Sequence, residues 1–127
     1  MTALLLVLAL LAASLVLYSS WASLRATRAW PPEGGFVALG GAFGGESLHY
    51  VDRGEARPGI APVVLIHGAS GNLRDMTQSL VEPLSRETRV IAIDRPGHGW
   101  SARTAHPDIA DPAVQARAIH EVLSQLG

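Results

Sequence analysis

The sequence contains neither cysteine nor lysine, and these absences exclude several kinds of protein. Without cysteine, the chain can form no disulfide framework, offers no thiolate nucleophile and cannot bind a metal through cysteine sulfur. All ten basic residues are arginine, and they are interspersed with eleven acidic residues to give a formal net charge of −1. Because the sequence has no basic stripe, we expect no nucleic acid as a partner.

The sequence also lacks the motifs of common cofactor sites. The glycine cluster at 40–45 has no Gly-Lys-Ser/Thr, so it is no phosphate-binding loop. Residues 97–102 (GHGWSA) follow an apolar run and match G-x-G-x-x-A, but a dinucleotide site needs a helix opening at these glycines, and Thr104–Pro107 follow instead. Four histidines have no carboxylate or second histidine at metal-ligand spacing: His49, His98, His106 and His120. The sequence therefore predicts neither a cofactor nor a metal ion.

A long apolar run occupies residues 3–17 and is followed by Tyr18 and Trp21. A helix of about 17 residues is roughly 26 Å long, which is at the short limit for crossing a bilayer. Tyrosine and tryptophan favour the membrane–water interface. We interpret residues 1–21 as a single transmembrane anchor, with residues 3–21 contacting the membrane. Residues 22–35, which contain Pro31-Pro32, are expected to form a juxtamembrane linker.

Two other interpretations of this run stay open. It could be a signal peptide cleaved after the small-residue pattern 20–22, in which case the protein is secreted. No arginine precedes the run, however, whereas Arg25 and Arg28 follow it. By the positive-inside rule this asymmetry places the body of the protein in the cytoplasm. The third interpretation is a buried core helix, for which a chain this short offers little core.

The remaining residues, 36–127, have the pattern of an α/β domain. Two β-branched runs, 63–66 and 90–93, flank a helix-like segment, and each ends in a polar, glycine-rich turn. Strand, helix and strand in this order form the βαβ unit of a parallel sheet. Residues 36–39 and 47–51 predict an antiparallel hairpin before it. Because ligands bind at the carboxyl ends of parallel strands, the two turns are the expected site.

Capping residues mark the expected helices. Asn72 is a plausible N-cap with Asp75 at the third helical position, and Pro83 should end or kink the helix that follows. Asp111-Pro112 is a good start for the last helix, which we expect to end at Gly127.

Three segments together resemble the α/β-hydrolase family. They are residues 48–54 (LHYVDRG), 64–70 (VLIHGAS) and 89–101 (RVIAIDRPGHGWS), and their order and spacing match the family's second, third and fourth strands. The resemblance implies that residues 36–127 form the N-terminal part of an α/β-hydrolase sheet. It also implies hydrolysis of an ester or similar bond in a small molecule, by a Ser–His–Asp/Glu triad. Family members with an aspartate nucleophile, the dehalogenases and epoxide hydrolases, are not excluded.

Within these residues the resemblance assigns one chemical role. One donor of the family's oxyanion hole is a backbone N–H in the loop after the third strand, and the matching residue is Ala69. Gly68 lets the backbone turn closely beneath a substrate, and His67 is interpreted as holding the loop rather than as a catalytic base. The alternative is an ordinary strand-to-helix turn.

The sequence has no nucleophile elbow, because no serine lies in G-x-S-x-G. Ser47, Ser70 and Ser101 each have the first glycine of that motif and lack the last. We expect the elbow and the triad to follow Gly127 in a longer hydrolase. The alternatives are an inactive remnant, a membrane-tethered interaction module, or a separate chain that completes the sheet.

Overall fold

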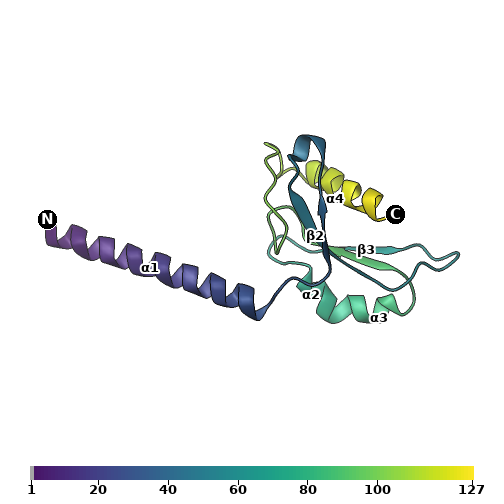
Figure 1. Ribbon diagram of the computed structural model, residues 1–127, viewed down its shortest axis with the longest axis horizontal. Helices are drawn as coiled ribbons and strands as arrows, with labels where there is room; N and C mark the ends of the chain where they lie inside the picture. Colours follow the sequence, from purple (N-terminus) through teal and green to yellow (C-terminus); the bar gives the residue numbers. More distant parts are fainter. Residues whose placement is uncertain (1) are drawn as a thin grey trace. The chain divides into compact units, whose positions relative to one another are not determined.

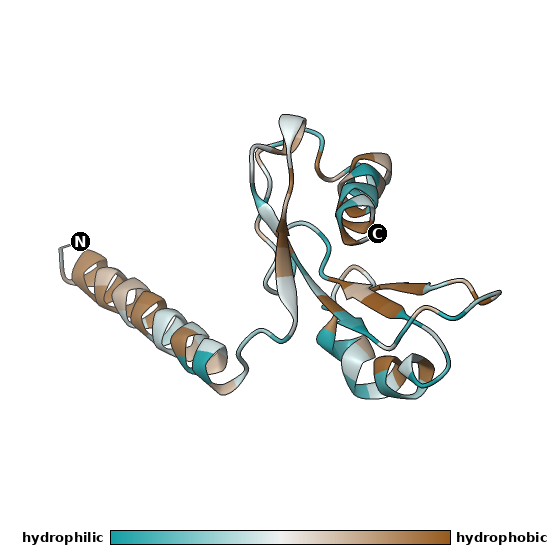
Figure 2. Ribbon diagram, turned by 45° about the vertical axis from the view of Figure 1, so that its right-hand side comes forward, coloured by the Kyte–Doolittle hydropathy of each residue, from teal (hydrophilic) through white to brown (hydrophobic). Residues whose placement is uncertain are grey.

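The computed structural model describes residues 2–127, which divide into two compact units, residues 2–31 and 32–127. In the first unit, α1 (Thr2–Ala29) is one unbroken helix that buries none of its residues. Figure 2 shows the apolar residues along its N-terminal part. Its length and apolar composition suffice to cross a bilayer, a property that signal sequences share.

Helix α1 is longer than its apolar run. It extends past Trp21 to Ala29, so the first half of the expected linker is helical. Residues 22–29 consist of alanine, leucine, arginine, serine and threonine, and no proline interrupts them before Pro31. The division into anchor, linker and hydrolase part stays a prediction.

The second unit is built on a mixed sheet of four strands in the order β1-β2-β4-β3 (Figure 1). The strands are β1 (Gly35–Ala38), β2 (Ser47–Arg53), β3 (Val63–Ile66) and β4 (Val90–Ile93). Strands β1 and β2 are antiparallel, as are β2 and β4, whereas β3 and β4 are parallel. A short 3-10 turn, η1 (Gly41–Phe43), lies between β1 and β2. The expected hairpin and the expected βαβ unit are both confirmed.

The register of the parallel pair brings the two expected site loops together. Val63 lies beside Val90, and Ile66 lies beside Ile93. Both strands therefore end at the same edge of the sheet, where His67 and Asp94 begin their loops.

A single helical segment connects β3 to β4. It comprises α2 (Arg74–Met76), the π-helical turn η2 (Thr77–Val81) and α3 (Glu82–Ser85). Asn72 Oδ1 accepts from Arg74 N at 2.9 Å, and Asp75 Oδ2 accepts from Asn72 N at 3.1 Å. These reciprocal bonds satisfy N–H groups at the start of the segment. The residue directly before α2 is Leu73, however, one position after the predicted N-cap Asn72.

Pro83 does not end this helix, contrary to one of the two outcomes expected. It has no N–H to donate to the preceding turn, and its ring needs extra room there. The π-helical turn Thr77–Val81 lies immediately before it and provides a wider turn. The helix therefore continues to Ser85.

The two faces of the sheet are covered by different helices. Helix α4 (Pro112–Leu126) begins after Asp111, whose side chain accepts from Ala113 N at 2.8 Å. It buries its apolar face on one side of the sheet, and α2–α3 lie on the other (Figure 1). The α4 side includes Ile91, Ile93, Val114, Ala118 and Val122. The α2–α3 side includes Val51, Leu73, Val81, Val90 and Ala92. Alternate residues of β4 thus face opposite layers, as a strand with helices on both sides requires.

Candidate functional site

The candidate site lies where the loops after β3 and β4 meet, and His67 joins them. Its side chain is buried. Its Nε2 accepts from Arg95 N at 3.0 Å, so the ring proton resides on Nδ1, which donates to Gly68 O at 2.7 Å. The ring is therefore neutral, with both nitrogens engaged by backbone atoms. This arrangement holds the loop in place and leaves no ring nitrogen for a substrate.

Ala69 offers an unused backbone donor. The residue is exposed, and within residues 2–127 its N–H donates to no protein acceptor. Its carbonyl oxygen lies 3.2 Å from His98 Nε2. His98 Nδ1 in turn lies 3.1 Å from Pro96 O, and the His67 and His98 rings are 5.2 Å apart between centroids. The side chain of His98, in the loop after β4, therefore contacts the carbonyl oxygen of Ala69. The N–H of Ala69 is available to an incoming oxygen atom.

Asp94 is the hydrogen-bonding centre beneath these loops. It is 1% exposed. Its Oδ1 accepts from Leu73 N at 2.7 Å, and its Oδ2 accepts from Trp100 N at 3.0 Å. The hydroxyl of Ser101 donates to Asp94 O at 2.7 Å. Asp94 and Ser101 thus tie their own loop, and Asp94 also anchors the start of the α2 segment.

His49 completes this cluster, a role that the sequence did not predict. Its Nδ1 lies 2.8 Å from Asp94 Oδ2, and its Nε2 lies 2.5 Å from Glu33 O. The ring thus links the Asp94 carboxylate to the backbone before β1. His49 and Asp94 form a buried hydrogen-bonded pair. The signal in the sequence was a histidine placed inside the apolar strand 47–51.

The hydrogen bonds on Asp94 control its protonation. Burial raises the pKa of this carboxyl, but the bond from His49 and the backbone donors Trp100 and Leu73 lower it by more. The net result is a pKa below the ordinary value for aspartate. Asp94 is therefore a carboxylate at neutral pH and acts as an acceptor only.

Neither Ser101 nor Ser70 is placed as a nucleophile. Ser101 is buried, and besides donating to Asp94 O its hydroxyl accepts from His49 N at 2.9 Å. Ser70 is exposed in the loop beside Ala69. In the described part of the chain, no group of three or more His, Asp or Glu side chains could hold a metal ion.

Comparison with known proteins identifies the family. Residues 63–127 match the model of the alpha/beta hydrolase family. Over 87 residues the chain is 31% identical to the monoacylglycerol lipase abhd6-A of Xenopus laevis, covering 68% of this chain and 25% of that protein. Over 80 residues it is 39% identical to the dihydrolipoyllysine-residue acetyltransferase component of the acetoin cleaving system of Pseudomonas putida, covering 54% and 21%. The chain thus spans a quarter or less of these relatives.

A solved structure agrees with the fold described above. The crystal structure of a probable hydrolytic enzyme from Pseudomonas aeruginosa PAO1 superposes with a TM-score of 0.65 at 21% identity. The match covers 77% of this chain and 31% of the other. It confirms the expected N-terminal α/β-hydrolase sheet.

Proposed function

Because this chain belongs to the alpha/beta hydrolase family, we propose that it forms the N-terminal part of a membrane-anchored esterase or lipase. In this proposal the N–H of Ala69 is one donor of the oxyanion hole, and His67 and Gly68 hold it in position. The nucleophile and its partners belong to other parts of the enzyme. The observation that carries the proposal is the exposed and unused N–H of Ala69, on a loop fixed through His67.

The chemistry of ester hydrolysis explains why such a donor matters. Attack on the carbonyl carbon places negative charge on the substrate oxygen. A fixed N–H stabilises that charge without reorganisation, and losing one donor costs on the order of 3 kcal/mol in barrier. The buried bonds of His67 to Arg95 N and Gly68 O supply the required rigidity.

The relatives support acyl chemistry at this site. One is named a monoacylglycerol lipase and another an acetyltransferase component, and both names describe reactions of an acyl group. An apolar helix at the N-terminus suits an enzyme whose ester substrates reside in a membrane. We therefore propose esters of lipid-like small molecules as the substrate class.

The test is an assay of the intact native polypeptide, extracted from membranes in mild detergent. We expect it to hydrolyse a p-nitrophenyl ester, and a serine-reactive phosphonate should abolish the activity and add its mass to the protein. Hydrolysis that survives the phosphonate, with an acyl intermediate on an aspartate, would replace serine by aspartate as the nucleophile. Absence of hydrolysis with any p-nitrophenyl ester from acetate to palmitate would favour the inactive or interaction-module alternative.

A further inference from the structure

The C-terminal part of α1 carries two aromatic and two cationic side chains on one face. These residues, called the α1 stripe below, are Tyr18, Trp21, Arg25 and Arg28. At 3.6 residues per turn their positions fall within about 80° of the helix circumference. All four side chains are exposed, and Figure 2 shows hydrophilic residues gathered at this end of the helix. The α1 stripe begins where the apolar run ends, so an anchored α1 presents it to lipid headgroups.

The side chains of the α1 stripe contact one another along the helix. The rings of Tyr18 and Trp21 are 6.1 Å apart between centroids, and the guanidinium carbon of Arg25 lies 5.3 Å from the centroid of the Trp21 ring. Helical side chains lean toward the N-terminus, which here is the direction of the apolar run. A guanidinium over an aromatic ring keeps its N–H edges available to an acceptor. The Arg25 charge is therefore held at the level of Trp21 and can still donate.

The spacing of the α1 stripe matches the thickness of one headgroup layer. Along the helix axis Arg25 follows Trp21 by about 6 Å, and Arg28 follows it by about 10 Å. The headgroup layer on each side of a bilayer is about 5–8 Å thick. Tryptophan resides at the boundary between this layer and the hydrocarbon. With Trp21 at that boundary, lipid phosphates lie at the level of Arg25 and within reach of the Arg28 side chain, which also leans toward the membrane.

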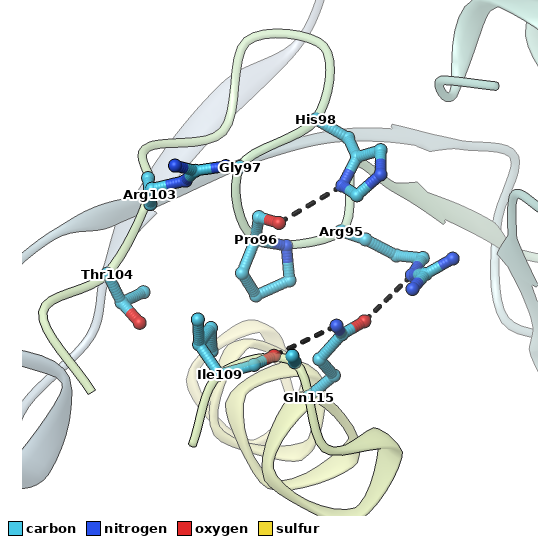
Figure 3. A pocket seen from close by; sticks show the side chains of 9 residues that line it. Arg95, Pro96, Gly97, His98, Arg103, Thr104, Ile109 and Gln115 are labelled. Carbon is cyan, nitrogen blue, oxygen red and sulfur yellow. Dashed lines mark hydrogen bonds between the residues drawn. The ribbon is translucent and has the colours of Figure 1, made fainter. Parts of the chain in front are cut away.

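No carboxylate of α1 competes for these two positive charges. Residues 2–32 contain neither aspartate nor glutamate. In the second unit, by contrast, a buried arginine can be held by another side chain: Arg95 Nε donates to Gln115 Oε1 at 2.8 Å (Figure 3). The charge that complements the α1 stripe is therefore not supplied by the helix that carries it.

From the contacts, depth and charge of the α1 stripe, we infer that it binds the headgroup of a phospholipid with net negative charge. The guanidinium groups of Arg25 and Arg28 donate charge-assisted hydrogen bonds to the phosphate oxygens. Trp21 and Tyr18 place their polar edges in the same layer. A zwitterionic headgroup carries its own cation beside the phosphate and therefore binds less tightly. The inference rests on the proposed membrane anchor and is independent of the proposed ester hydrolysis.

Four variants separate binding by the α1 stripe from a general effect of charge. Arg25→Gln and Arg28→Gln each remove one guanidinium from the stripe. Arg25→Thr combined with Thr27→Arg, the exchange variant, keeps composition and net charge but moves the guanidinium about 160° around the helix. Arg117→Gln, on the exposed face of α4, is the matched control for the loss of one positive charge. All of these residues are exposed, so the variants should fold as the wild type does.

The experiment counts the lipids bound to the intact native polypeptide by native mass spectrometry from detergent micelles. Phosphatidylglycerol and phosphatidylcholine with the same acyl chains are titrated separately. We expect phosphatidylglycerol to bind saturably and about tenfold more tightly than phosphatidylcholine. Arg25→Gln and Arg28→Gln should each weaken this binding by about fivefold, and the exchange variant should weaken it as much as Arg25→Gln does. Arg117→Gln should leave it unchanged.

The outcomes decide between the α1 stripe and its alternatives. Tighter binding of phosphatidylglycerol that all three stripe variants weaken supports the inference. Equal binding of the two lipids overturns it and leaves the anchor standing, because extraction in alkaline carbonate tests the anchor separately. Undiminished binding by the exchange variant, or equal weakening by Arg117→Gln, also overturns it, since charge alone then suffices. A wild type that carbonate releases from membranes overturns the proposed anchor, and the inference with it.

Discussion

At the scale of single residues, Asp94 connects more of the structure than any catalytic candidate does. It binds the β2 strand through His49, the α2 segment through Leu73 N and its own loop through Trp100 N. Because both partners of the His49–Asp94 pair are buried, water cannot replace the hydrogen bond between them. The cluster therefore sets the positions of the two loops that form the candidate site.

Neutralising Asp94 should destabilise the protein strongly. Asp94→Asn removes the negative charge that accepts buried hydrogen bonds from His49, Leu73 N and Trp100 N. Hydrogen bonds to a charged group contribute up to about 3 kcal/mol each. We expect the free energy of unfolding to fall by about 3 kcal/mol, measured by urea denaturation of the intact polypeptide. Glu55→Gln changes the same charge at an exposed position and should have little effect. Equal urea midpoints for the two variants would contradict the role of this pair.

Acid should weaken the protein through the same residue. The pKa of Asp94 is lower in the folded state than the ordinary value of about 3.9. As pH falls, the unfolded chain therefore takes up the proton first. The stabilisation is present above about pH 4 and is lost as pH falls through the folded pKa. Urea midpoints between about pH 5 and pH 2 should fall steeply for wild type and less for Asp94→Asn. Identical slopes would contradict this assignment.

At the scale of elements, local sequence patterns predicted the bounds of those strands and helices that depend on neighbouring residues alone. The bounds of β3 and β4 coincide with the apolar runs 63–66 and 90–93. The bounds of α4 follow from Asp111 and Gly127, because a cap acts within one turn of its helix.

Contacts between residues far apart in the sequence could not be predicted from local patterns. The His49–Asp94 contact joins residues 45 positions apart and exists only once β2 and β4 are in register. Strand β2 likewise runs beyond Val51 to Arg53, since Asp52 and Arg53 pair with β4. The Asp52 carboxylate also forms an ion pair with Arg89, whose Nη2 lies 2.8 Å from Asp52 Oδ2. Tertiary pairing thus extends an element past its local hydrophobic pattern.

The end of β2 should tolerate no side chain at Gly54. This residue has φ +76°, and an added Cβ would lie 2.4 Å from Ser85 O and 2.5 Å from Thr88 O. Gly59 has φ +79°, but nothing lies within 4 Å of its added Cβ. Gly54→Ala should therefore cost about 1–3 kcal/mol more than Gly59→Ala, the usual cost of overpacking. Thermal unfolding of both variants measures this difference in stability. Equal losses of stability would contradict the prediction, because the backbone at Gly54 would then move easily away from Ser85 O and Thr88 O.

At the scale of the whole molecule, the sequence combines an apolar helix with part of a hydrolase sheet. Strand β3 is at the edge of that sheet within the described residues, and Val64 and Ile66 are 38% and 51% exposed. The matched relatives are about four to five times as long as the aligned region. Those relatives therefore have further residues outside the region that matches this chain.

The proposed membrane anchor predicts a specific pattern of localisation. Leu8→Arg combined with Leu11→Arg places two charges in the apolar run, each costing about 3 kcal/mol at the centre of a bilayer. We expect wild type to stay in the membrane fraction in alkaline carbonate and this variant to be released. Leu24→Arg with Thr27→Arg, beyond Trp21, is the matched control and should stay membrane-bound. A mature N-terminus beyond residue 21, found by mass spectrometry, would establish the signal-peptide alternative instead.

The central claim, that the Ala69 N–H stabilises an oxyanion, is tested most directly by comparing two substitutions at that position. Ala69→Pro removes the N–H, whereas Ala69→Gly keeps it, and urea denaturation checks that both variants fold. In the intact polypeptide we expect Ala69→Pro to lower kcat for a p-nitrophenyl ester by about 10²–10³-fold with little change in KM. Ala69→Gly should retain kcat within a few-fold of wild type. A folded Ala69→Pro variant with undiminished kcat would contradict the account.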